Sequence, residues 1–186
     1  MHQNKTSLVT RSGQFGQSVC DCHIRFPAVE PVEIDLIRVV YNQSPRSVLT
    51  SYRDESTPLP GNVGLLVADD QADPGSTDAT IRIIDNTTIK MTTVSPTDLT
   101  GLGIQFTQLL TDVAETGNQT VVCFDSITAL LQFVDFDSAY KYLSTMTSQL
   151  RTKNIVSYFH LSPSAHDQIA HSRLKQLFGQ CITGDS

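Results

Sequence analysis

Thr120-Val-Val-Cys-Phe-Asp-Ser-Ile-Thr-Ala-Leu130 is the stretch that decides the fold of this chain. Its first half, Val121 to Phe124, is a continuous apolar run, as expected for a β-strand covered on both faces. Asp125 ends the run, and the residues from Ile127 onward predict a helix. The sequence therefore places a carboxylate at the carboxyl end of a core strand, where open α/β sheets bind their ligands.

Apolar runs of strand length recur along the chain and alternate with segments of helical periodicity. Three Ser-Pro pairs, Ser44-Pro45, Ser95-Pro96 and Ser162-Pro163, each follow such a run and fit a helix start, with Ser as the N-cap and Pro as the first helical residue. We expect strands at 7–10, 36–41, 63–68, 81–85, 89–94, 120–125, 155–161 and 181–183, and helices at 96–116, 136–152 and 163–178.

These alternating units predict a three-layer α/β domain with a central, mostly parallel sheet. We expect one domain over residues 1–186, with residues 1–6 as a disordered tail. The residues around Asp85-Asn86 fit either two strands or one broken strand. Cys123 and Cys181 lie in apolar runs and are predicted to be buried small hydrophobes.

Composition narrows the classes of function. The 186 residues are 39% apolar and 17% charged, with a net charge of -6, which fits a globular protein and disfavours direct nucleic-acid binding. No apolar run reaches the roughly 18 residues of a membrane-spanning helix. The N-terminal residues are polar, without the apolar core of a secretory signal. We expect a cytoplasmic protein that makes no contact with a membrane.

The turn after the first strand reads Arg11-Ser-Gly-Gln-Phe-Gly-Gln-Ser18. Against the phosphate-binding pattern GxxxxGK[ST], Gly16 and Ser18 match, Arg11 replaces the first glycine, and Gln17 replaces the lysine. Without the lysine, no fixed cation meets a triphosphate. The turn is either a weak, lysine-free phosphate cradle or a glycine-containing turn kept from an ancestor.

The second strand ends in Val39-Val-Tyr-Asn-Gln-Ser-Pro45. This end resembles the KaiC branch of the RecA superfamily, in which a pair of glutamates that activates the attacking water precedes Ser-Pro. Asn42 and Gln43 stand at those two positions here. An amide can hydrogen-bond a water but cannot take its proton, so the resemblance implies a lost catalytic base.

Three further segments carry the resemblance: Asp125 to Leu131, Thr97 to Ile104, and Ser157 to Asp167. Together they resemble a family of short haloarchaeal RecA/KaiC-like proteins of uncharacterised function, over about residues 7–184. The resemblance implies a RecA-like P-loop NTPase fold, lost nucleotide chemistry, and a role in signalling or transcriptional regulation. RecA-like domains assemble into rings or filaments, so it also allows a homo-oligomer.

Asp125 has two interpretations. It can bind magnesium through a water, or, with Ser126, it can cap the helix that opens at Ile127. With Gly16, Gln17 and Ser18 it forms a vestigial nucleotide site, and no catalytic residue is assigned. We expect no cofactor apart from weak binding of Mg-ATP.

Two groups of residues have the chemistry of metal ligands, but their spacing disfavours a metal site at either place. Cys20-Asp-Cys22-His23 has tighter cysteine spacing than a zinc knuckle and no second pair follows it. His160 lies on a predicted strand, while His166 and His171 are five apart on a helix and do not share a face well.

The sequence therefore favours a non-catalytic regulatory or adaptor protein that acts through protein partners. A second hypothesis is a switch that binds ATP or ADP weakly through Gly16, Ser18 and Asp125. A third is a hydrolase with His160 as its base, which needs a pocket joining His160 to Asp125.

Overall fold

The computed structural model describes residues 6–10, 29–54, 58–72 and 79–183. These residues form a mixed α/β fold around one eight-stranded sheet with the strand order β4-β5-β3-β2-β6-β7-β1-β8. All neighbouring strands are parallel except β4, which runs antiparallel to β5 at one edge. The strands are β1 (Thr6–Thr10), β2 (Ile34–Tyr41), β3 (Asn62–Ala68), β4 (Ala79–Ile84), β5 (Thr87–Val94), β6 (Gln119–Asp125), β7 (Val156–Leu161) and β8 (Gln180–Thr183).

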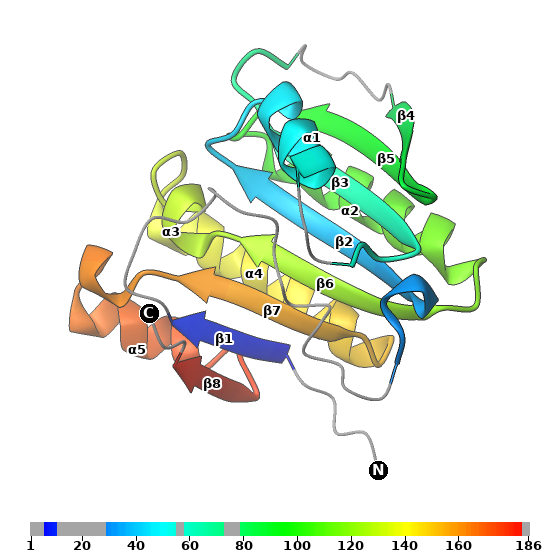
Figure 1. Ribbon diagram of the computed structural model, residues 1–186. Coiled ribbons are helices and arrows are strands. Elements are labelled where there is room, and N and C mark those ends of the chain that lie inside the picture. The colour runs from blue at the N-terminus through cyan, green and yellow to red at the C-terminus, as the bar shows by residue number, and fades with distance from the viewer. Residues whose placement is uncertain (1–5, 11–28, 55–57, 73–78, 184–186) are drawn as a thin grey trace.

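Helices cover both faces of the sheet. The α-helices of the described residues are α1 (Pro45–Asp54), α2 (Leu99–Ala114), α3 (Ile127–Leu130), α4 (Phe136–Thr152) and α5 (Gln168–Lys175), and two short 3-10 helices are η2 (Pro31–Glu33) and η3 (Pro163–Ala165). Figure 1 shows α1 in front of the sheet and α2 and α4 behind it. Three layers therefore result, as the alternating pattern predicted.

The core has two parts, one on each face. On the α1 face, Val48 and Tyr52 are fully buried against β2, β3 and β6. On the other face, Phe106 of α2 and Leu143 of α4 pack with Phe124 and the rest of the larger cluster. The central strand β2 is buried along its whole length, which explains why all its residues except Asp35 and Arg38 are apolar.

The eight strands lie where the sequence predicted them, within two residues at each end. Thr6, which the sequence placed in the tail, is the first residue of β1 and is fully buried. Asp85 and Asn86, with φ of 46° and 69°, form the two-residue turn of a β4–β5 hairpin, so two strands are present rather than one broken strand. Cys181 is exposed, contrary to prediction, because β8 is an edge strand.

Helix starts were predicted less well. Ser44 is confirmed as a cap, since its Oγ accepts the N–H of Ser47 at 3.2 Å before α1. Ser95 and Ser162 do not cap α-helices: the residues after them form a turn and the 3-10 helix η3. Asp98 and Asp167 cap α2 and α5 instead, each accepting the backbone N–H three residues on, at 2.8 and 2.7 Å. A carboxylate suits this place because it meets the positive end of the helix dipole.

Candidate functional site

The candidate site lies at the carboxyl edge of the sheet, between β2 and β6. From β2 the chain continues into α1 on one face, and from β6 it continues into α3 and α4 toward the opposite face (Figure 1). Adjacent parallel strands that lead in opposite directions leave a crevice at their carboxyl ends, which is where open α/β sheets bind ligands. Asp125 ends β6 and Asn42 directly follows β2, so both of these predicted site residues lie at this edge of the sheet.

Asp125 is paired with an arginine of β2 that was not among the predicted site residues. The Arg38 Nη2 lies 2.9 Å from Asp125 Oδ2, and only 1% and 8% of the two side chains are exposed. Arg38 comes from the middle of β2, opposite Cys123 in the register with β6. The carboxylate thus meets a fixed positive charge from the neighbouring strand.

The second oxygen of Asp125 is less fully satisfied. Oδ1 is buried and makes no hydrogen bond with the part of the chain that the structure describes. The cap of α3 is Ser126, whose Oγ accepts the N–H of Ala129 at 3.1 Å. The capping interpretation is therefore confirmed for Ser126, while the Asp125 carboxylate turns to Arg38.

Asn42 is an exposed residue that directly follows β2 at the same edge of the sheet. Its Nδ2 donates to Oε1 of Gln132, in the turn after α3, at 2.9 Å, and its backbone has a φ of 59°. Asn tolerates this left-handed conformation better than most residues. Gln43 follows and is half-buried. Asn42 and Gln43, predicted to stand where the resemblance expects two glutamates, therefore both follow β2 at this edge of the sheet. The side-chain amide of Asn42 is hydrogen-bonded to Gln132.

Tyr41, the last residue of β2, packs into the core on the face of the sheet opposite α1. Its ring lies 5.9 Å from that of Phe124 and 6.0 Å from that of Phe133, centre to centre. Burial, followed by the proximity of Tyr142, raises the pKa of the Tyr41 hydroxyl far above its usual range. The hydroxyl is therefore protonated at neutral pH.

His160 contacts a different partner from the one that the hydrolase hypothesis required. Its Nε2 lies 3.4 Å from Cys123 Sγ on the adjacent strand, and both side chains are buried on the α1 face. Asp125 lies two residues beyond Cys123 on β6 and is held by Arg38. The buried Cys123 confirms one of the two cysteine predictions.

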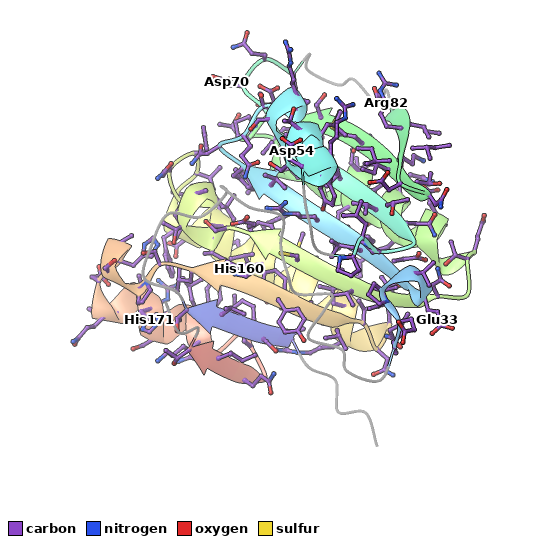
Figure 2. All side chains as sticks on the ribbon, in the orientation of Figure 1. Glu33, Asp54, Asp70, Arg82, His160 and His171 are labelled. Atoms are coloured by element: carbon purple, nitrogen blue, oxygen red, sulfur yellow. The ribbon has the colours of Figure 1, made fainter. Side chains whose placement is uncertain are left out.

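The other two histidines lie apart from His160. Figure 2 labels His160 over the central strands and His171 at the side of the molecule, on α5. The His166 Nε2 lies 3.0 Å from Thr128 Oγ1, and burial, then the charge of His171, lowers the pKa of His166, with Asp167 opposing. No three His, Cys, Asp or Glu side chains within the described ranges are grouped to hold a metal ion.

Several predicted site residues lie outside the described residues. These are Gly16, Gln17 and Ser18 of the turn that resembles a phosphate loop, together with the Cys20 to His23 segment. The vestigial phosphate cradle therefore stays a prediction. Arg38 could have been found from the sequence, because it and Asp35 are the two charged residues of the otherwise apolar strand Ile34 to Tyr41, and a buried charge requires a partner.

Across the described ranges, no helix has the length and apolar character needed to cross a membrane. A search of curated proteins finds no match. The sequence model of one protein family, described as a family of unknown function (DUF7504), matches residues 7–183. This match covers the whole sheet except Thr6, the first residue of β1, and the chain therefore belongs to the DUF7504 family.

Proposed function

We propose that this protein is a non-catalytic, RecA/KaiC-like regulatory or adaptor protein, in signalling or transcriptional regulation, that acts through protein partners and does not hydrolyse ATP. The observation that carries the proposal is the buried pair of Arg38 and Asp125. We also propose that the protein is cytoplasmic and does not contact nucleic acid or membrane directly. A homo-oligomer is compatible with this function.

The pair argues against magnesium chemistry at the crevice. A magnesium ion needs carboxylate or water oxygens, and Asp125 is the acidic group at the end of β6. The guanidinium of Arg38, 2.9 Å from one carboxylate oxygen, already neutralises that charge. Two cations at one buried carboxylate repel each other strongly in a low-dielectric interior. Arg38 thus takes the place that a metal ion would need.

The neighbouring groups support the same conclusion. Asn42 and Gln43 stand where the resemblance expects two glutamates, and an amide cannot accept the proton of an attacking water. The Asn42 side chain is bound to Gln132, across the crevice. The position of Asp125 at the carboxyl end of β6, beside β2, is compatible with the RecA-like fold that the resemblance implies.

Phosphate release from Mg-ATP by the purified full chain tests the proposal. We expect no rate above that of a buffer blank, for the wild type or for the Asp125→Ala variant. A turnover that the wild type shows and Asp125→Ala loses, with both proteins folded by circular dichroism, would overturn it.

Asp125 Oδ1, which accepts no hydrogen bond from the described residues, favours a second candidate function, a switch that binds ATP or ADP weakly. A water bound to magnesium could donate to this oxygen while Arg38 holds the other. Gly16, Gln17 and Ser18 would form the phosphate side of such a site. Calorimetric titration with Mg-ATP separates the two functions: binding at micromolar concentration that Ser18→Ala removes would establish the switch and exclude the purely structural adaptor.

A further inference from the structure

A groove of about 820 Å³ runs between α2 and α4, on the layer that faces away from the Arg38–Asp125 pair. Its lining extends over residues 99–111 on α2 and 138–149 on α4. At 1.5 Å of rise per residue, each wall is about 17 Å long, or three helical turns. Its volume is within the usual range for small-molecule pockets. Its shape differs, because the groove is elongated along α2 and α4.

The walls of the groove are less polar than their sequence indicates. Thr107, Thr111 and Thr145 each donate their hydroxyl to the carbonyl four residues earlier in the same helix, at 2.9, 3.0 and 3.0 Å. These hydroxyls are hydrogen-bonded within their own helices. The threonines therefore offer their methyl groups, rather than unpaired hydroxyls, for contacts in the groove. Gln149 Nε2 also donates to Thr107 Oγ1 at 3.3 Å and joins the two walls.

Two neighbouring residues of α2, Gly103 and Ile104, line the groove although neither is needed for the packing of the core. Ile104 is 61% exposed, although it is a large apolar residue. Gly103 lies inside the helix, where glycine costs about 0.5–1 kcal/mol relative to alanine. A Cβ at Gly103 would meet only a ring carbon of Tyr142, at 3.9 Å, so the packing leaves room for a side chain. Glycine keeps this part of the groove open.

We propose that this groove binds a three-turn amphipathic helix of a partner protein. Apolar residues of that helix, spaced i, i+3 or i+4, and i+7, would contact Ile104 and fill the space beside Gly103. Lys141 is the one charged residue among the described residues that line the groove, so the partner helix carries an acidic residue facing it. A second copy of this chain that docks through the same groove fits less well, because the described lining residues include a lysine and no carboxylate.

This inference rests on the adaptor function proposed above and names the kind of partner. The probe is a library of displayed 14-residue helical peptides, selected against the full chain. We expect the enriched peptides to share the i, i+3/i+4, i+7 apolar pattern with one acidic position. One enriched peptide is then synthesised with a fluorescent label, and its dissociation constant is measured by anisotropy against wild-type and variant proteins.

Matched variants locate the binding site. Gly103→Leu, which fills the groove, should weaken binding about 10-fold or more, whereas Gly103→Ala should change it less than about 3-fold. Lys141→Ala should weaken binding by about 3- to 10-fold and make it less sensitive to salt, while Lys153→Ala, at the exposed end of α4, should change it less than about 2-fold. Thermal unfolding of each variant confirms that it folds.

Three results would overturn the proposal: enrichment without the helical pattern, equal binding to Gly103→Leu and the wild type, or a dimer in light scattering that Gly103→Leu dissociates. The last would show that a second copy occupies the groove. Phosphate release is measured on the same samples. Peptide binding together with ATP turnover would refute the non-catalytic function and leave the groove assignment intact.

Discussion

Replacing Arg38 by methionine tests the buried ion pair. Arg38→Met keeps much of the side-chain length but leaves Asp125, at 8% side-chain exposure, without its cation. Removing one partner of a buried pair costs about 3–5 kcal/mol, since the remaining charge stays desolvated. The total stability of a domain is about 5–15 kcal/mol, so the variant should fold but with much of its margin lost.

Urea unfolding followed by circular dichroism gives the magnitude. With a slope of about 2 kcal/mol per molar urea, the midpoint should fall by about 1.5–2.5 M. The double variant Arg38→Met/Asp125→Leu removes both charges and should recover most of the loss, because an apolar pair avoids the desolvation cost. A loss of less than about 1 kcal/mol in the single variant, or a double variant as unstable as the sum of its singles, would refute the reasoning.

Three further predictions concern stability. Asp35→Ala removes a fully buried carboxylate that accepts hydrogen bonds from three side chains, and should cost about 2–4 kcal/mol in thermal unfolding; a cost near zero would contradict this. Phe106→Ala should cost about 3–5 kcal/mol, whereas Ile104→Ala, at an exposed position of the same helix, should cost less than about 0.5 kcal/mol, and equal costs would be inconsistent with the packing. The folded-state pKa values of His166 and His171 are lowered below 6.5, mainly by burial, so the unfolded chain binds more protons below that pH. Their contribution should be complete above pH 6.5 and be lost as the pH falls toward the folded-state values, and a double substitution to glutamine should flatten this slope in denaturation series.

The sequence predicted the sheet well because burial on both faces leaves a direct signal. β3 and β6 are continuous apolar runs, and neither has a competing helical pattern. The bounds of α4, Phe136 to Thr152, were predicted without error, because its apolar stripe and the Asp135 cap agree. Local signals of this kind do not depend on contacts with distant parts of the chain.

Predictions failed where two local signals compete for the same role, or where a contact with a distant part of the chain determines the structure. Ser95 and Asp98 are both good N-caps three residues apart, and the aspartate is the one at the start of α2. The partner of Arg38 is 87 residues away, so only the strand register brings the two charges together. The amide of Asn42 was predicted at the site, but its contact with Gln132 depends on the turn after α3.

Binding of Mn²⁺, a paramagnetic substitute for Mg²⁺, tests most directly whether Arg38 takes the place of a metal ion at Asp125. Free Mn²⁺ is measured by electron paramagnetic resonance during titration of the wild type and of Asp125→Asn. The account predicts that both proteins leave the Mn²⁺ signal equally unchanged up to millimolar concentrations. Submillimolar binding by the wild type that Asp125→Asn abolishes would contradict it.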